Sequence, residues 1–267
     1  MPLVYTLPTK SGKFSFKILP IKISSLRPHE ETIPQETEKL IKGFQKNGVQ
    51  KNPITVDESS LTILDGMHRF EVAKKIGLEF VLAMCVDYFF KGIEVKTWNR
   101  VFDCELKEAL RIVEQNAEQV GKGDFLLKSK SFSIKFELSG DKVTQYRKFS
   151  KLVELFKQNF GEPRFATSTK SKKDEIVLVP PPITKIDVIQ SAQQGKLFPP
   201  KSTRHVFPVR LLLAQIPIKL LANKKLDQES ADDAVSAYFR SLDLVLVKGK
   251  SMLEGRRYDE ENLLFFI

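Results

Sequence analysis

The chain has 267 residues, of which 42% are hydrophobic and 28% are charged, and it carries a net charge of +10 at pH 7. These values are typical of a soluble globular protein with one large domain or two modest ones, and no apolar run approaches the ~20 residues of a membrane-spanning helix. The only two cysteines, Cys85 and Cys104, do not form a CxxC pair, which excludes a disulfide scaffold and a cysteine-based zinc site.

The first part of the chain predicts short strands and one helix. Its first residues, MPLVYTLPTKSGKF, lack the continuous apolar core of a signal peptide, so we expect a cytoplasmic protein. Residues 21–26 predict a strand, which Pro28 ends because proline cannot donate to a strand ladder. Glu30 then falls on a loop at a strand end, where catalytic groups are often presented. A helix is predicted over 34–47, where Gly48 follows as a typical stop.

Residues 63–70, Ile-Leu-Asp-Gly-Met-His-Arg-Phe, predict a turn from a strand into a helix. Asp65 closes the strand, and the free N–H groups of a helix start, beside a glycine that permits close approach, suit an anion. Arg69 adds a planar guanidinium that fits phosphate oxygens. An ordinary Asp-Gly turn is the alternative. We predict that this turn binds nucleotide phosphates through its last four residues before Phe70, namely Gly66, Met67, His68 and Arg69.

The middle of the chain predicts a central strand over 80–88 and a short strand over 93–98, which contains the only tryptophan, Trp98. A helix is predicted over 105–119, and the Gly-Lys-Gly sequence that follows it is the best candidate for a domain boundary. We therefore predict two parts. They are an N-terminal domain of residues 1–120 and a second, smaller lobe of residues 121–267. Both parts mix helices with strands, so the predicted fold class is α+β (mixed α/β).

Residues 199–206 interrupt the periodic pattern of the second part, in which we predict strands over 131–136 and 176–179 and a helix over 146–160. Five consecutive polar residues stand here between two prolines and an apolar segment. Such a cationic, donor-rich loop suits a carboxylate or a phosphate, although a plain polar surface loop is the alternative. The predicted substrate-binding residues of this loop are Lys201, Ser202, Thr203, Arg204 and His205.

Three separated segments resemble the ParB/sulfiredoxin superfamily, and among its members most closely the archaeal free serine kinases. The segments are Pro28-His29-Glu30, Asp65-Gly66-Met67-His68-Arg69 and Pro200-Lys201-Ser202-Thr203-Arg204-His205-Val206, and Thr97-Trp98 is a weaker fourth match. The resemblance implies a ParB/sulfiredoxin-like, nucleotide-binding N-terminal domain, with the active site in the cleft between it and the second lobe. One departure is that these kinases usually have histidine where Met67 stands.

Two other chemistries of the superfamily fit the residues less well. Sulfiredoxins have a nucleophilic cysteine where Met67 stands, and a thioether cannot form a thiolate, so that activity is excluded. ParB-type partition proteins have Gly-Glu-Arg-Arg at the turn and a helical DNA-reading domain, whereas this chain is predicted to be mixed α/β after residue 120. The net charge of +10 indicates mainly a solvated surface. A ParB-like, nucleotide-binding protein that binds DNA or regulates, without kinase activity, remains the alternative.

The resemblance implies phosphorylation of free L-serine to O-phospho-L-serine by ATP or ADP, with Mg²⁺ as cofactor. Glu30 would be the general base, and Asp65 would hold Mg²⁺ directly or through water. Trp98 and the polar residues of the 199–206 loop would recognise serine. On this interpretation we expect neither a nucleic acid nor a membrane as partner. The residues do not distinguish ATP from ADP, and they leave open the oligomeric state, the pathway that uses the product (cysteine synthesis or another) and the role of residues 211–267.

Overall fold

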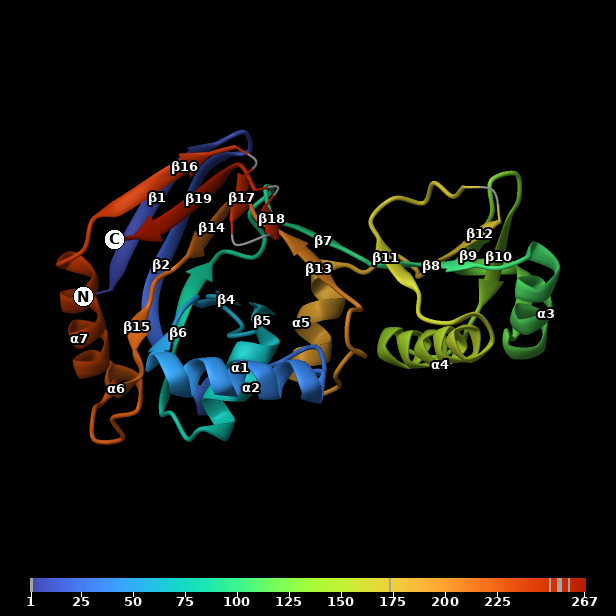
Figure 1. Ribbon diagram of the computed structural model, residues 1–267. Helices are drawn as coiled ribbons and strands as arrows, with labels where there is room; N and C mark the ends of the chain where they lie inside the picture. Colours follow the sequence, from blue (N-terminus) through green and yellow to red (C-terminus); the bar gives the residue numbers. More distant parts are fainter. Residues whose placement is uncertain (1, 173, 250, 254–255, 259) are drawn as a thin grey trace. The chain divides into compact units, whose positions relative to one another are not determined.

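The chain folds as two compact units (Figure 1). Unit 1 consists of Met1–Glu94, Ala192–Gly195 and His205–Ile267, and unit 2 consists of Val95–Ser191 and Lys196–Arg204. The computed structural model describes residues 2–172, 174–249, 251–253, 256–258 and 260–267. The chain first leaves unit 1 within the short strand β7 (Glu94–Lys96) and returns to it for the last time within β13 (Arg204–Val206). Each unit mixes helices and strands, which confirms the predicted fold class.

The domain boundary predicted between residues 120 and 121 differs from this division. Gly121 and Gly123 lie inside strand β9 (Gln119–Lys128), both with positive φ, and the pairing of β9 with β10 (Ser133–Glu137) shifts register there. A Cβ atom on Gly123 would lie 2.4 Å from the Phe136 carbonyl oxygen. The two glycines therefore mark a β-bulge in a hairpin, where the backbones approach closely, and not a linker.

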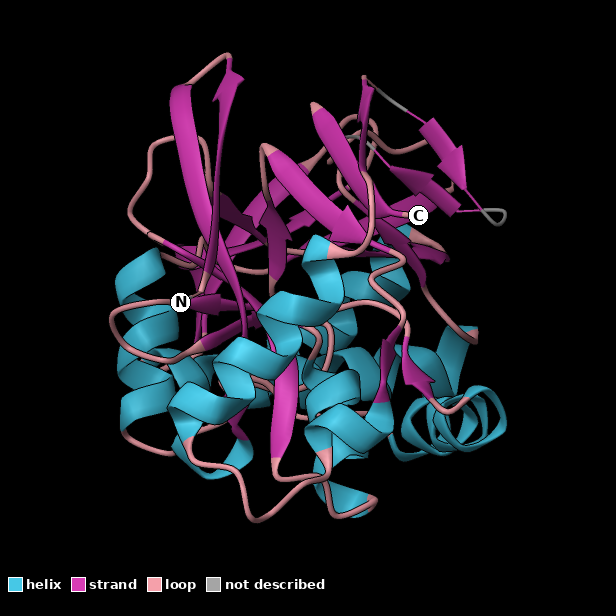
Figure 2. Ribbon diagram, turned by 90° about the vertical axis from the view of Figure 1, so that its left-hand side faces the viewer, coloured by secondary structure: helices cyan, strands magenta, loops and turns pink. Residues whose placement is uncertain are grey.

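Unit 1 is built on a five-stranded sheet in the order β1-β2-β6-β4-β5. Every residue of β6 is buried, as expected for a central strand of apolar residues that pairs antiparallel to β2 and parallel to β4. Two helices that pack against each other accompany this sheet. Figure 2 shows the helices of the chain in cyan and its strands in magenta. The elements are β1 (Leu3–Thr9), β2 (Gly12–Lys22), β4 (Ile54–Asp57), β5 (Ile63–Asp65), β6 (Phe80–Val86), α1 (Pro34–Asn47) and α2 (Met67–Lys75).

The C-terminal residues, predicted to belong to the second lobe, complete unit 1 instead. Strand β19 (Asn262–Phe266) lies between β14 (Val209–Leu212), to which it is parallel, and β16 (Leu244–Lys248), to which it is antiparallel. Helix α7 (Gln228–Arg240) packs beside β2 and buries its apolar face. Shorter elements of unit 1 are η1 (Ile23–Ser25), β3 (Val49–Gln50), β15 (Ile216–Pro217), α6 (Ile218–Leu221), β17 (Ser251–Leu253) and β18 (Arg256–Tyr258).

Unit 2 has its own five-stranded sheet, in the order β10-β9-β12-β8-β11, and a core rich in phenylalanine. The predicted helix over 146–160 begins earlier, at Lys142, because the Asp141 carboxylate accepts a hydrogen bond from the Thr144 N–H and caps the helix. The remaining elements are β8 (Asn99–Asp103), α3 (Leu106–Asn116), α4 (Lys142–Phe160), β11 (Arg164–Ala166), β12 (Glu175–Val179) and α5 (Lys185–Gln193), the last of which extends two residues past the boundary of unit 2.

Candidate active site

The predicted turn from a strand into a helix is present at residues 65–69, which we call the phosphate turn. Strand β5 ends at Asp65, Gly66 is the N-cap of α2 with φ 98°, and Met67 is the first helical residue. The Met67 side chain is buried, so only its backbone N–H is available to face an anion. The first N–H groups of a helix have no acceptor within the helix, and the helix dipole favours negative charge there. The departure at Met67 is therefore compatible with a phosphate site.

The Arg69 side chain folds back over the glycine of this turn. A Cβ atom on Gly66 would lie 2.7 Å from Arg69 Nη2 and 2.8 Å from a methyl carbon of Ile54, so only glycine leaves room for the guanidinium. Arg69 Nη2 donates a hydrogen bond to Asp65 Oδ2 at 3.1 Å. Arg69 Nε is buried and has no hydrogen-bond partner among the described residues. A buried donor without an acceptor costs about 1–3 kcal/mol, and an anion bound at the turn would remove that cost.

Asp65 has a second guanidinium partner that the sequence analysis did not identify. Arg210, on β14, donates from Nη1 to Asp65 Oδ2 at 2.7 Å and from Nε to Glu260 Oε1. Burial disfavours the charged form of Arg210, but the two carboxylates outweigh this effect and raise its pKa above the ordinary value. The signal in the sequence is one arginine within the apolar run Phe-Pro-Val-Arg-Leu-Leu-Leu, because a charge in such a strand needs a buried partner.

Glu30 lies on a segment that runs beside the strand leading to the phosphate turn. Arg27 forms a parallel β-bridge with Thr62. His29 Nδ1–H donates a hydrogen bond to the Ile63 carbonyl oxygen at 2.6 Å. His29 is almost fully buried, and burial lowers its pKa to about 4, so the imidazole is neutral at pH 7. Glu30 itself is half-buried. Unit 1 thus holds the predicted base and the phosphate turn on neighbouring segments.

Two histidines predicted to belong to the site, His68 and His205, have structural contacts within unit 1. His68 Nε2 accepts a hydrogen bond from the Ile33 N–H at 2.9 Å, which ties the start of α1 to α2. His205 is buried, and its Nε2 lies 2.7 Å from the hydroxyl oxygen of Tyr88. The His205 ring also lies edge-on to the His29 ring, with centroids 5.5 Å apart. The side chain of His68 therefore organises the turn, and His205 belongs to a polar cluster inside unit 1.

The other predicted substrate residues come together in unit 2. The guanidinium carbon of Arg204 lies 5.4 Å from the centroid of the Trp98 ring, a cation–π distance. Ser202 is buried, and its hydroxyl donates to the Pro199 carbonyl oxygen at 2.7 Å, so it shapes the loop. Thr203 is half-buried between these two residues.

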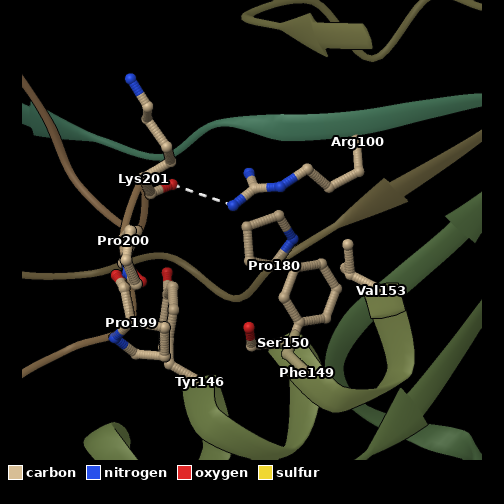
Figure 3. A pocket seen from close by; sticks show the side chains of 10 residues that line it. Arg100, Tyr146, Phe149, Ser150, Val153, Pro180, Pro199, Pro200 and Lys201 are labelled. Carbon is tan, nitrogen blue, oxygen red and sulfur yellow. Dashed lines mark hydrogen bonds between the residues drawn. The ribbon is translucent and has the colours of Figure 1, made fainter. Parts of the chain in front are cut away.

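Arg100 holds this loop in place. Its Nη2 donates to the Lys201 carbonyl oxygen at 3.0 Å (Figure 3), while Nη1 donates to the Trp98 carbonyl oxygen. Lys201 has φ 63°, a left-handed conformation that costs a non-glycine residue about 1–3 kcal/mol and that persists only where the surroundings enforce it. Figure 3 shows the Lys201 side chain extending away from the small pocket beneath it. The pocket is lined by residues of β8, α4 and the loop, including Arg100, Tyr146, Phe149, Ser150, Pro199 and Ser202.

Across the described part of the chain, no three His, Cys, Asp or Glu side chains form a group that could hold a metal ion. The helices of that part are also too short or too polar to cross a membrane.

Several curated proteins match most of the chain, among them the following three. A ParB-like protein of Sulfolobus acidocaldarius is 29% identical over 184 residues, which are 68% of this chain and 86% of that protein. The ADP-dependent L-serine kinase SerK of Thermococcus kodakarensis is 26% identical over 225 residues, 76% of this chain and 91% of the kinase. An ATP-dependent L-serine kinase of Staphylothermus marinus is 28% identical over 229 residues, 75% and 90% of the two chains. The chain is a homologue of these proteins. No family model matches it.

Solved structures show the same relationship at the level of fold. A free serine kinase mutant in complex with ADP matches with a TM-score of 0.62 at 21% identity, covering 81% of this chain and 97% of that one. C-terminally truncated SbnI from Staphylococcus aureus matches with a TM-score of 0.66 at 15% identity, covering 82% and 94%. The chain has the mixed α/β fold of these two proteins, which agrees with the resemblance found in the sequence.

Proposed function

We propose that the protein is a nucleotide-dependent kinase of free L-serine, which produces O-phospho-L-serine. One observation supports this function above the others. In the phosphate turn, a helix start that only glycine can cap is combined with a buried Arg69 donor that has no partner in the described residues. The curated relatives that contribute to the proposal are L-serine kinases matched over three quarters of this chain. Nucleotide and free serine are both available in the cytoplasm, which we propose as the location.

Phosphoryl transfer requires a group that orients the attacking hydroxyl and accepts its proton. We assign this role to Glu30, because it is half-buried and stands beside the strand that carries Asp65. The serine Oγ–H proton passes to the Glu30 carboxylate as the Oγ–P bond forms. The bond between phosphorus and the bridging oxygen of the nucleotide breaks, and the leaving group is ADP when ATP is the donor or AMP when ADP is the donor.

The phosphate turn stabilises the charge that develops on the transferred group. The first N–H groups of α2 and the Arg69 guanidinium point donors at a bound anion, which is the preorganised arrangement that lowers the barrier of such reactions. Mg²⁺ fits this site only as an ion carried by the nucleotide, because Mg²⁺ is commonly bound by one or two carboxylates together with phosphate oxygens. Asp65, about one-third exposed, is the carboxylate that would hold it. Bound there, the ion would neutralise charge on the phosphates.

The loop of unit 2 provides recognition of the amino acid in this proposal. Arg204, with its planar guanidinium over Trp98, is assigned to the serine carboxylate. Lys201 and Thr203 are assigned to further polar contacts with serine, and buried Ser202 and Arg100 to the shape of the loop. Of the curated kinases, one is ADP-dependent and one is ATP-dependent, so either nucleotide is a candidate donor.

The direct test is an incubation of the purified protein with Mg²⁺, L-serine and either ATP or ADP, followed by mass spectrometry of the products. We expect O-phospho-L-serine together with ADP or AMP, and no product when serine is left out. An assay that yields no O-phosphoserine with either nucleotide, from protein that binds neither, would reject the kinase function.

The assignment of Glu30 is tested by Glu30→Gln, with Glu31→Gln as the matched control on the adjacent residue. We expect Glu30→Gln to lower kcat by roughly 10²–10⁴-fold, because the amide cannot accept the proton, while the dissociation constant of the nucleotide stays near normal. Glu31→Gln should retain most activity. Near-normal turnover of Glu30→Gln would remove Glu30 from the chemistry while leaving the kinase function itself intact.

A further inference from the structure

Asp65 Oδ2 is shared between two guanidinium groups of different character. Arg69 comes from the phosphate turn itself, four residues later, and contacts Asp65 at 3.1 Å. Arg210 comes from β14, 145 residues later, and contacts the same oxygen at 2.7 Å. The Arg210 side chain is 13% exposed and that of Arg69 is 21% exposed. Arg210 is therefore the closer and more enclosed partner of the two.

A second carboxylate fixes Arg210, which leaves Arg69 as the movable partner. Glu260 accepts a hydrogen bond from Arg210 Nε, and the Phe207 ring lies 5.6 Å from the guanidinium carbon. The guanidinium is thus engaged at two of its nitrogens by two carboxylates, whereas Arg69 Nε has no partner in the described residues. A planar guanidinium that is hydrogen-bonded at two nitrogens loses much of its conformational freedom. Arg210 therefore remains bound to Asp65 when an anion binds nearby.

We infer that Arg210 is a positioning residue for the phosphoryl transfer: it keeps Asp65 neutralised so that Arg69 can turn from that carboxylate to a nucleotide phosphate. This inference rests on the proposed function. A phosphate that recruits Arg69 Nη2 as well as Nε breaks the Asp65–Arg69 pair, and breaking an enclosed pair is costly when it leaves a carboxylate without a cation. With Arg210 in place, Asp65 retains a cationic partner while Arg69 moves from Asp65 to the phosphate, so this movement has a low free-energy cost.

The same contacts give the C-terminal segment a role. Glu260 stands two residues before the start of β19, and the Asn262 N–H donates to the Pro208 carbonyl oxygen at 3.2 Å. Strand β19 then runs parallel to β14, with Leu263 opposite Arg210. These contacts fix both Arg210 and Glu260 from the backbone. Residues 211–267, to which the sequence pattern assigns no role, thereby supply a carboxylate that positions the phosphate turn through Arg210.

A double-mutant cycle tests whether Arg210 acts through Asp65. The variants are Arg210→Met, Asp65→Asn and the double variant, and the readout is the dissociation constant of ADP, measured by calorimetry with EDTA so that no metal contributes. We expect Arg210→Met to raise this constant at least ~10-fold, about 1.4 kcal/mol, when Asp65 is present. In the Asp65→Asn background the same substitution should change it less than ~3-fold, because no carboxylate then retains Arg69.

The outcomes separate the inference from the function on which it rests. If Arg210→Met changes the dissociation constant of ADP equally in both backgrounds, or in neither, the positioning role is overturned. ADP binding and O-phosphoserine formation by the unmodified protein would still support the kinase function. Failure of the unmodified protein to bind ADP overturns both. If Arg210→Met does not fold, Glu260→Gln replaces it in the cycle. This variant keeps an oxygen acceptor for Arg210 Nε. We then expect the dissociation constant of ADP to rise at least ~3-fold when Asp65 is present. A rise of the same size in the Asp65→Asn background contradicts the inference.

Discussion

The residues of the candidate site differ in whether their side chains are already engaged in the structure. His68 and His205 are engaged with Ile33 and Tyr88, so they hold the frame. Arg69, in contrast, has a buried nitrogen without a partner in the described part of the chain. A residue that lacks an acceptor in the absence of ligand gains most when an anion binds. We propose that this distinction separates residues that bind the nucleotide from residues that shape its site.

Arg204 is expected to bind the serine carboxylate, and Arg204→Lys tests this. A lysine ammonium cannot form the bidentate contact of a guanidinium and packs less well over the Trp98 ring. We predict that the KM for serine rises at least ~10-fold, about 1.4 kcal/mol. The KM for the nucleotide should change little, as steady-state kinetics with each substrate varied in turn will show. A selective rise in the nucleotide KM would instead assign the loop to phosphate.

His29 predicts a loss of stability in mild acid. Its pKa is lowered to about 4 by burial, opposed by the Ile63 carbonyl and the nearby Asp65 charge, and the His205 ring packs against it. The unfolded chain, with an ordinary pKa of about 6.5, therefore binds the proton first as the pH falls. The stability that His29 contributes is complete above pH 6.5 and is lost between pH 6.5 and 4, by up to about 3 kcal/mol.

Urea unfolding of the unmodified protein and of His29→Gln at several pH values measures this effect. Glutamine can still donate to the Ile63 carbonyl but does not titrate in this range. The free energy of unfolding of His29→Gln should therefore fall less steeply between pH 6.5 and 4. Identical slopes for the two proteins would show that His29 accepts a proton in the folded state as readily as in the unfolded one.

At the scale of the element, the turn into α2 depends on Gly66 for two separate reasons. The residue has φ 98°, and a Cβ atom there would lie 2.7 Å from Arg69 Nη2. Gly77, just beyond the end of the same helix, also has positive φ (74°), but a Cβ atom there meets nothing within 4 Å. Both Gly66→Ala and Gly77→Ala add left-handed strain of about 1–2 kcal/mol. Only the first also displaces the arginine.

We predict that Gly66→Ala raises the dissociation constant of ADP at least ~10-fold, whereas Gly77→Ala leaves it within ~2-fold of normal at a similar loss of thermal stability. Titration calorimetry and thermal denaturation of both variants measure the two quantities. Equal weakening of ADP binding by the two substitutions would mean that the helix as a whole, and not the position of Arg69, determines the affinity.

The sequence predicted those elements whose cause is local. The Asp-Gly pair before a helical pattern marked the phosphate turn, and the apolar run at 80–88 marked a buried central strand. The apolar run around Arg210 marks a charge that needs a buried partner, but it does not identify that partner, because Asp65 is 145 residues away. Gly121 was predicted to mark a domain boundary, because glycine is typical of a boundary as well as of a bulge. Both features depend on which distant residues pair with each other, and short-range periodicity does not reveal such pairing.

At the scale of the whole molecule, the net charge of +10 bears on the alternative function. One relative is a ParB-like protein, which keeps a DNA-binding or regulatory role as the alternative to kinase activity. We predict only weak binding to duplex DNA, which disappears as salt is raised, because scattered lysines bind by releasing counterions. Fluorescence anisotropy with labelled DNA at increasing salt measures it. Sequence-specific binding at physiological salt, together with no turnover of nucleotide, would favour the regulator.

The discontinuity of unit 1 along the chain has a consequence for biosynthesis. Its sheet begins with the first strands, but Arg210 and Glu260 follow only after unit 2 has been translated. A ribosome-bound chain that ends before residue 210 presents Asp65 and Arg69 without the cation that completes their arrangement. The nascent phosphate turn therefore matures last, although its own residues are made early. If the turn binds nucleotide as proposed, we expect this binding to begin only after the final strand has emerged.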